Sequence, residues 1–300
     1  MALESLHAVT YFARPCRHAL RASGLVGFWT GYFAARAAPL GRVGAGPVSA
    51  AFFNFEPGMV ADAVPGCWKV VDPAALTVVR AVAGSGALGE LCSPDALGEA
   101  VGALPRLRIA SSRCSDAGRT LTGVNRALWA SVEPELLREG LEEHQLALAE
   151  IWQACTTLRE HRGDGHVAVL VAHGLGGCEA HVLAAAAEAI PTEVLRDNRG
   201  WSRSQWEDAA ARLSRRGLLR PDGAASDDGL VLRESIEVTT DVLAEEAYAS
   251  LADDDIGALY DALVPCAREL QESGLYPFPN PMGLPQGPFT ARGVPRRPMG

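Results

Sequence analysis

The stretch that decides the fold runs from Gly200 to Gly229 and reads GWSRSQWEDAAARLSRRGLLRPDGAASDDG. Ser202 and Gln205 have the spacing of a capping box, in which each side chain hydrogen-bonds the backbone of the other residue at the start of a helix. We therefore expect an amphipathic helix from Ser202 to Arg216. Four apolar residues recur at helical spacing and predict its buried stripe: Trp206, Ala209, Ala210 and Leu213.

The second half of the stretch predicts a small hairpin and then another helix. Gly217 is a helix stop signal, and the residues from Leu218 to Ala225 can form two short strands around the turn Pro221-Asp222-Gly223. Ser226 can cap the helix that follows. A helix, a turn, a second helix and a short hairpin wing predict a winged helix-turn-helix.

The whole chain has the composition of a folded, acidic protein. Of its 300 residues, 48% are hydrophobic and 21% are charged, with a net charge of −9, which is typical of globular proteins. The seven cysteines include no C-x-x-C pair, and the N-terminus MALESLHAVTYFARP lacks a secretory pattern. No uninterrupted apolar run reaches about 18 residues. We expect reduced thiols, a cytoplasmic protein and no membrane partner.

The positions of glycine and proline between apolar segments predict a mainly α-helical protein with two domains and a tail. Residues 1–130 predict a helical domain, and residues 131–275 contain the winged helix. The junction is expected in the Gly-, Ser- and Pro-rich region 84–131. Residues 276–300, rich in Pro and Gly, predict a tail that is unstructured or draped on the surface.

The two halves of the chain contain one pair of weakly similar segments, called the echo below. AARAAPLGRVGAGPVSAA in the first is similar to TLREHRGDGHVAVLVA in the second. One interpretation is that the first domain is a degenerate winged-helix repeat, which would make the monomer a pseudo-dimer. A homodimer is the alternative.

A dense polar cluster follows the helix expected from Pro134 to Glu160. The segment HRGDGH predicts a corner between two helices, at which Asp164 caps the second. Histidines near an acid can transfer protons near neutral pH, and arginine can hold a carboxylate. We interpret His161, Asp164 and His166 as candidate catalytic residues and Arg162 as a ligand-binding residue. The alternative is that these are structural side chains with satisfied hydrogen bonds.

A second polar set lies in the first half of the chain. Trp29, Tyr32, Arg36 and Asn54 are interleaved with phenylalanines, and Tyr32 and Arg36 share one helix face. We interpret the four as candidate ligand-binding residues across a central cavity from the polar cluster, although aromatics at this spacing are more often core.

A metal or another cofactor is not expected. His173, Cys178 and His181 offer nitrogen and sulfur ligands, but their spacing matches no zinc pattern.

The net charge of the predicted winged helix argues against nucleic acid as a partner of the protein. Residues 193–229 contain seven arginines and seven acids, so the net charge of the segment is zero, whereas contacts to phosphates provide most of the affinity of DNA-binding proteins. Asp208 can pair with Arg212 four residues further on. If DNA is bound, Arg203, Arg215 and Arg216 are the candidate phosphate contacts.

Two resemblances bear on the fold. The run from Thr192 to Leu243 is similar to the core of the multiple-antibiotic-resistance regulator (MarR) type of winged-helix protein. This implies that the Ser202–Arg216 helix enters the major groove while a basic wing meets the minor groove. The chain also resembles a bacterial helix-turn-helix family over nearly its whole length, in the segments HAVTYFARP, FWTGYFAARAAPLG, LREHRGDGHVA and YPFPNPMGLP. This second resemblance implies no particular activity.

These observations favour a small-molecule-binding protein on a winged-helix scaffold. Its ligand is expected to be a small organic acid or a polyketide-like metabolite of specialised metabolism, and whether the ligand is turned over stays open. The alternative is a ligand-responsive, MarR-like transcription regulator. The G-x-S-x-G, G-x-x-x-x-G-K-[ST] and G-x-G-x-x-G patterns that mark ordinary hydrolases, kinases and dehydrogenases are absent in the required context.

Overall fold

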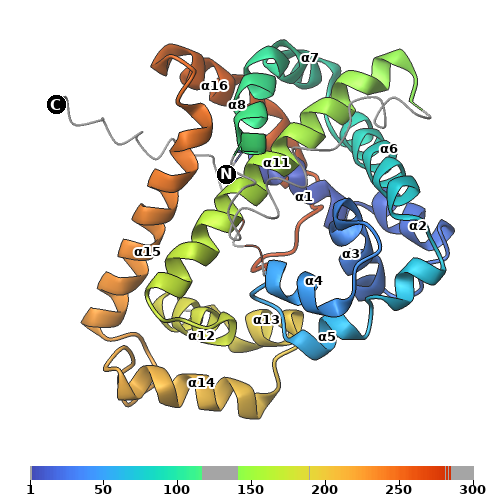
Figure 1. The fold of residues 1–300 in the computed structure, drawn as a ribbon. Helices are drawn as coiled ribbons and strands as arrows, with labels where there is room; N and C mark the ends of the chain where they lie inside the picture. The colour runs from blue at the N-terminus through green and yellow to red at the C-terminus, as the bar shows by residue number, and fades with distance from the viewer. Residues whose placement is uncertain (1, 117–140, 189, 281, 283, 285–300) are drawn as a thin grey trace.

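A single helix of 30 residues, α11 (Glu143–Ala172), runs through the centre of the protein and organises the other helices around it (Figure 1). At 1.5 Å per residue it is about 45 Å long. The computed structural model describes residues 2–116, 141–188, 190–280, 282 and 284. Within these residues the fold is mainly α-helical, as expected.

The first core surrounds the N-terminal half of α11. Leu6, Leu107, Trp152 and Leu263 are among its fully buried side chains. A Cβ at Gly84 would lie 3.1 Å from the Trp152 indole, so the glycine allows α6 to approach α11 closely. The surrounding helices are α1 (Ala2–Phe12), α6 (Pro73–Leu91), α7 (Pro94–Gly102), α8 (Leu104–Asp116) and α16 (Asp253–Glu272).

The second core is an aromatic cluster beside the first. Phe33, Phe52 and Trp68 are buried in it. Pro57 is the first residue of α5, and the Asp72 side chain accepts hydrogen bonds at the start of α6. Its elements are α2 (Arg14–Ala22), α3 (Phe28–Ala37), η1 (Ala38–Leu40), α4 (Ala45–Ala51), α5 (Pro57–Ala61) and η2 (Gly66–Lys69).

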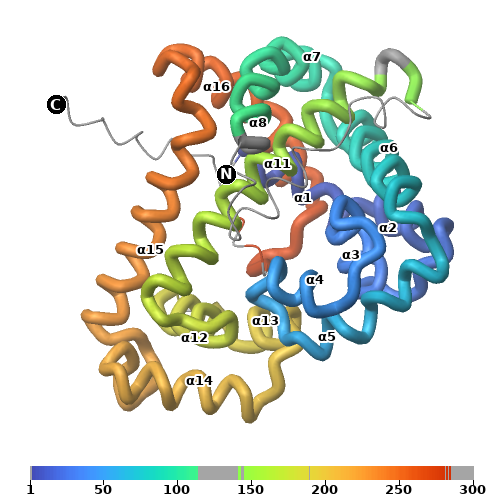
Figure 2. Tube along the Cα trace, in the orientation of Figure 1, coloured from blue at the N-terminus to red at the C-terminus, as the bar shows by residue number. Residues whose placement is uncertain are grey.

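The third core forms a head at the C-terminal end of α11 (Figures 1 and 2). The expected capping box is confirmed: the Ser202 amide donates to Gln205 Oε1 over 2.8 Å, and the Ser202 hydroxyl accepts from the Gln205 amide. Trp206 and Leu213 are buried as predicted. The head consists of α12 (Gly177–Glu188), α13 (Thr192–Arg196), η5 (Asp197–Arg199), α14 (Arg203–Arg215) and α15 (Asp227–Glu245), which η6 (Glu246–Tyr248) connects to α16.

The predicted hairpin wing is wrong. Between α14 and α15 a single antiparallel bridge joins Leu219 to Ala225, and no strand forms within the described residues. The Arg220 amide donates to the Ala224 carbonyl and the Ser226 amide to the Leu218 carbonyl on either side of this bridge. The ladder extends no further because α14 ends at Arg215 and Ser226 already caps α15.

The predicted helix corner at HRGDGH is also wrong, because α11 continues through it. Gly163 and Gly165 look like breaks in the sequence, but Gly165 instead lets α15 come close: a Cβ there would lie 3.3 Å from Leu243 Cβ. Asp164 is therefore an interior residue of α11 and not an N-cap. The start of the helix expected at Pro134 lies outside the described residues.

The region expected to be a domain junction and the expected tail both contain ordered structure. Residues 84–116 form the end of α6, the helices α7 and α8 and their short connections, while residues 117–131 of the expected junction lie outside the described residues. The Tyr276 side chain is 3% exposed, and its hydroxyl donates to the Ser5 carbonyl over 2.6 Å. The beginning of the tail is therefore part of the first core.

The echo between the halves does not correspond to similar structure. Its first copy spans the α3–η1–α4 region, whereas its second copy, residues 157–172, lies entirely within the uninterrupted helix α11.

One described helix, α6, is long and apolar enough to cross a membrane, as are α11 and α12 if taken together as one bent pair. Buried residues make up 44% of the apolar window of α6, and core helices of soluble proteins meet the same criterion.

Candidate ligand-binding site

The predicted catalytic residues on α11 face α15. His161 Nε2 lies 3.2 Å from the Leu243 carbonyl oxygen, and His166 Nδ1 lies 3.0 Å from Thr240 Oγ1. Asp164, which lies between the two histidines in the sequence, is also buried. The three residues are close together but do not line the pocket described below, so the catalytic role given to them stays a prediction.

Arg162, predicted to bind ligand, instead forms ion pairs across the same helix contact. Its Nη2 lies 2.8 Å from Glu237 and 2.9 Å from Asp241, and Arg233 also pairs with Glu237. Burial alone would raise the pKa of Glu237, but the two arginines lower it to about 2. Burial lowers the pKa of His166 to about 4. These contacts favour the structural alternative for this cluster.

A buried ion pair joins Arg36, from the second predicted polar set, to Glu160 on α11, the residue before the predicted polar cluster. Arg36 Nε and Nη2 donate to the two carboxylate oxygens of Glu160 over 3.1 and 2.9 Å, while Arg36 Nη1 donates to the Tyr32 hydroxyl over 3.1 Å. Burial would raise the pKa of Glu160, but the charges of Arg36 and Arg159 lower it to about 2. Arg36 therefore contacts α11 directly, and no cavity separates this pair.

A second buried network lies beside the first. His7 Nε2 is 3.0 Å from the Tyr11 hydroxyl, and His7 Nδ1 is 2.9 Å from Thr156 Oγ1. Burial, followed by the charges of nearby arginines, lowers the pKa of His7 well below its usual value, so the ring is neutral. The network fixes the position of the Tyr11 ring, which is 5.0 Å from the Tyr32 ring.

Arg80, from the middle of α6, brings a positive charge into the same region. Its Nε donates to Thr10 Oγ1 over 3.1 Å and its Nη1 to the Ala35 carbonyl over 3.2 Å. The guanidinium lies 5.1 Å from the Trp152 ring centre and 5.8 Å from that of Tyr11. Burial lowers the pKa of Arg80.

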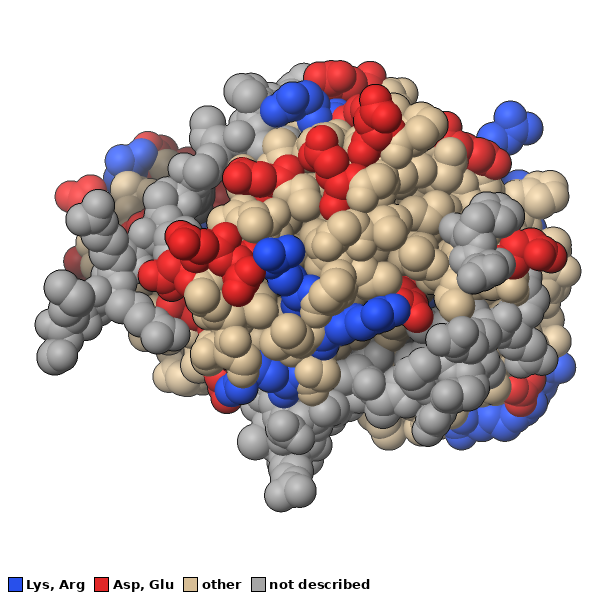
Figure 3. Space-filling view, turned by 90° about the horizontal axis from the view of Figure 1, so that it is seen from above, with Lys and Arg blue, Asp and Glu red and all other residues tan. Residues whose placement is uncertain are grey.

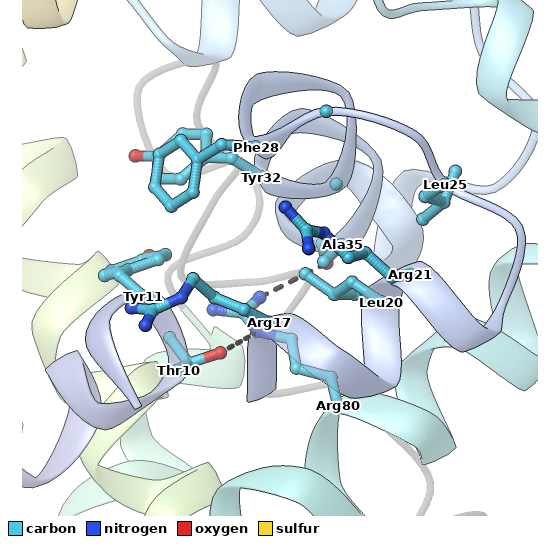
Figure 4. Close-up of a pocket in the computed structure, with 12 residues that line it drawn as sticks. Thr10, Tyr11, Arg17, Leu20, Arg21, Leu25, Phe28, Tyr32, Ala35 and Arg80 are labelled. Carbon is cyan, nitrogen blue, oxygen red and sulfur yellow. Dashed lines mark hydrogen bonds between the residues drawn. The ribbon is translucent and has the colours of Figure 1, made fainter. Parts of the chain in front are cut away.

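A pocket of about 50 Å³ lies between α1, α2, α3 and α6 (Figure 4), and of the side chains just described it is lined by Thr10, Tyr11, Tyr32 and Arg80. Such a volume holds several water-sized groups. Arg17 and Arg21 are exposed at its rim, and Arg80 is buried at its wall. None of the lining residues is acidic. They are Thr10, Tyr11, Arg17, Leu20, Arg21, Leu25, Gly27, Phe28, Gly31, Tyr32, Ala35 and Arg80.

The pocket has one aromatic side and one basic side. In Figure 4, Phe28 and Tyr32 lie together on one side, Tyr11 lies beside Arg17, and the Arg21 guanidinium points inward. Planar apolar walls next to guanidinium groups suit a flat organic molecule that carries a negative charge. A neutral or cationic molecule would leave the arginines without a matching charge.

Two other predicted ligand-binding residues lie outside the pocket lining. Trp29 packs against the pocket residues, with its ring centre 5.5 Å from that of Tyr32. The carbonyl oxygen of Asn54 accepts from Trp201 Nε1 over 3.2 Å and lies 3.2 Å from His181 Nε2, which ties this loop to the head. Their role in ligand binding stays a prediction.

The nitrogen and sulfur side chains that the sequence analysis weighed as metal ligands and set aside lie on different elements. His173 is exposed at the end of α11, while Cys178 is buried in α12. The described part of the chain contains no group of three or more His, Cys, Asp or Glu side chains placed to hold a metal.

The arginines of the head are mostly engaged within the protein. Arg212 pairs with Glu179 over 2.7 Å and not with Asp208 as predicted, and Arg216 donates to the carbonyls of Gly174 and His173. Arg203 and Arg215 are exposed.

The surface seen from above in Figure 3 shows separate acidic and basic groups with uncharged areas between them. That view contains no continuous basic surface.

Sequence reasoning identified Tyr32 but missed the rest of the pocket. Two signals were available. His7 and Tyr11 lie four residues apart on one helix face, and RPCRHALRA, residues 14–22, has three arginines and no acid. Neither signal shows which distant segment completes the site.

Comparison with known proteins identifies the family but not the activity. No curated protein and no solved structure is significantly similar to this chain. Residues 1–277 match a helix-turn-helix family. Because this match covers almost the whole chain, the protein belongs to that helix-turn-helix family.

Proposed function

We propose that the protein binds a small organic anion with a planar, apolar body in the pocket formed by α1, α2, α3 and α6. The observation that carries this proposal is the composition of the lining, in which three arginines and two tyrosines occur with no acidic residue. Arginine holds a carboxylate through two parallel N–H donors, and tyrosine and phenylalanine rings offer flat contact surfaces. The helix-turn-helix head serves as scaffold in this proposal.

The position of the tyrosine hydroxyls supports a specific orientation of the ligand. Tyr32 is held by Arg36 and Tyr11 by His7, so both rings are fixed before the ligand enters. Preorganised side chains reduce the entropic cost of binding. The charged end of the ligand would lie toward Arg17 and Arg21, and its ring would lie against the tyrosines.

Benzoate and its neutral isostere benzamide provide a direct test. We expect benzoate to raise the melting temperature and to show saturable binding in calorimetry, whereas benzamide does neither, because it lacks the charge that pairs with the arginines. The double variant Arg17→Ala/Arg21→Ala removes exposed side chains and should abolish the benzoate effect while keeping the fold.

Arg203→Ala, an exposed arginine of the head, is the matched control and should bind benzoate normally. Equal binding of benzamide and benzoate, or unchanged benzoate binding by the Arg17/Arg21 variant, would contradict the proposal.

DNA binding is a second candidate, because the family that the chain matches is a helix-turn-helix family. A MarR-like mode of binding is part of this proposal and does not follow from the match. The candidate phosphate contacts are Arg203 and Arg215 on α14 and Arg216 directly after it, and all three are exposed. Fluorescence anisotropy with a labelled duplex from the upstream region of the gene, at several salt concentrations, tests it. Binding that weakens steeply with salt and is lost in Arg203→Ala/Arg215→Ala would support this function.

A further inference from the structure

Two exposed faces contain most of the large apolar side chains that remain accessible in the described part of the chain. Of eleven such side chains, three lie on one stripe of α15 and three surround the connection between α2 and α3. Monomeric soluble proteins rarely expose large contiguous apolar patches, and those that are rimmed by polar residues mark interaction sites. The charges around the two faces have opposite signs.

The first face, here called the acidic face, is the outer side of α15. Val231, Val238 and Val242 are 69%, 52% and 59% exposed and follow one another by seven and four residues, which places them on one stripe. Exposed acids flank this stripe, among them Glu234 and Glu245. The only basic residue of α15 is Arg233, which pairs with Glu188 and Glu237 of its own chain.

The second face, here called the basic face, combines α2 with the loop that follows it. Arg14 and two further arginines of α2 are exposed, and α2 contains no acid. Val26 is 85% exposed, and Val70 is 54% exposed and packs against Gly24, where a Cβ would lie 2.8 Å from Val70 Cγ1. The face comprises Arg14, Arg17, Arg21, Val26, Phe28, Lys69 and Val70.

We propose that copies of this chain associate head to tail, with the acidic face of one copy against the basic face of the next. A symmetric pair of acidic faces would bring like charges together, and so would a symmetric pair of basic faces. The two faces lie on opposite sides of the molecule (Figure 1), so one copy cannot satisfy both internally. Such an interface is heterologous and builds a ring or an open chain.

This arrangement also affects the pocket. Arg17, Arg21 and Phe28 belong both to the basic face and to the pocket lining, so α15 of the neighbouring copy covers the pocket mouth. The inference does not rest on the proposed ligand, since it follows from the two surfaces alone.

Two variants, one for each face, test the proposal without touching the pocket. Val238→Arg/Val242→Arg disrupts the acidic face, and Arg14→Glu/Val26→Glu disrupts the basic face. Wild-type protein should self-associate in analytical ultracentrifugation at up to about 100 µM, a range that detects even micromolar interfaces. Raising the salt to about 1 M, where the screening length falls to about 3 Å, should weaken the association.

Each variant alone should be monomeric, yet an equimolar mixture should form a one-to-one dimer and nothing larger. This follows because the first variant keeps its basic face and the second keeps its acidic face. Melting curves close to that of the wild type show that both variants fold. Ile109→Arg changes an exposed apolar residue outside both faces and should associate like the wild type.

Three outcomes would overturn the proposal. The first is a wild-type protein that stays monomeric over the whole range. The second is a single variant that still dimerises, which would indicate a symmetric interface. The third is a mixture that stays monomeric. If a monomeric wild type binds phosphatidylglycerol vesicles through Arg14 and Val26, the basic face serves a membrane and the proposal is wrong.

Discussion

At the residue scale, the protein contains ionisable groups whose state is set by burial and by partners from distant segments. Arg36 and Glu160 are both less than a tenth exposed and form an ion pair, and Glu160 also pairs with Arg159 over 3.3 Å. Removing one member of a buried pair leaves an uncompensated charge in the interior, whereas replacing both members with apolar residues is often tolerated. The pair therefore fixes the position of Tyr32 at the pocket through the hydrogen bond from Arg36.

Glu160→Gln should lower the free energy of unfolding by about 3–5 kcal/mol, because Arg36 stays buried without its counter-charge. Urea unfolding measures the loss. The double change Arg36→Met/Glu160→Leu should cost clearly less than the single one. Glu234→Gln, at an exposed position of α15, is the control and should change stability little; a similar loss in both single variants would show that the ion pair has no special role.

His166 should make stability depend on pH in the acidic range. Its pKa in the folded protein is lowered to about 4, first by burial and then by Arg162 and Arg233, against the attraction of Glu237. Between pH 6.5 and 4 the unfolded chain therefore binds a proton that the folded chain does not, so stability falls as the pH falls through this range.

Replacing His166 with asparagine removes its share of this loss, at most about 3 kcal/mol between neutral pH and pH 4. Chemical unfolding at a series of pH values should give a shallower slope for His166→Asn than for the wild type. His173→Asn, at an exposed histidine, is the matched comparison. Parallel slopes for the wild type and His166→Asn would argue against a buried neutral imidazole.

At the scale of elements, glycines allow close approach between helices and loops that are far apart in sequence. Gly177 begins α12 directly against the carbonyl group of Phe53, and a Cβ there would collide with that oxygen. Gly165 plays the corresponding role between α11 and α15. These contacts hold the head against the rest of the protein.

Gly177→Ala should destabilise the protein by about 1–3 kcal/mol, because backbone must shift to accommodate the methyl group. Gly257→Ala is the control: it is exposed in α16, a Cβ there meets nothing within 4 Å, and alanine is the better helix former by about 0.5–1 kcal/mol. Thermal unfolding should therefore move in opposite directions for the two variants. A Gly177→Ala protein as stable as the wild type would mean that the loop moves away without cost.

At the scale of the whole molecule, the two ends of the described chain meet in the first core. Tyr276 follows α16 and reaches α1, where its ring packs edge to face on Phe12 at 5.5 Å. The segment that the composition marks as a tail therefore contributes to the stability of the N-terminal helices.

Tyr276→Ala should lower the stability by about 3 kcal/mol or more, as expected for a buried aromatic side chain. Tyr276→Phe keeps the ring and should lose only about 1 kcal/mol, the contribution of one hydrogen bond. Differential scanning calorimetry distinguishes these values. Wild-type stability in Tyr276→Ala would contradict the packing of this segment against α1.

The pattern of correct and wrong predictions follows the range of the interactions involved. The capping box at Ser202 and Gln205 and the cap at Ser226 are confirmed, because their hydrogen bonds join residues three apart in the sequence. The corner at Asp164 was wrong because glycines in the sequence do not reveal whether they break a helix or permit a close contact. The pairing of Arg212 was wrong because Glu179 lies 33 residues away.

The sequence by itself determined the mainly helical class, the caps of several helices and the buried stripe of α14, since these depend on neighbours within one or two turns. Only the tertiary structure decided that α11 is continuous, and that Arg80 from α6 meets Tyr11 and Tyr32 in one pocket. The physical reason is that burial and charge pairing depend on which distant segments pack together. That choice is made by the whole core and not by any local stretch of the chain.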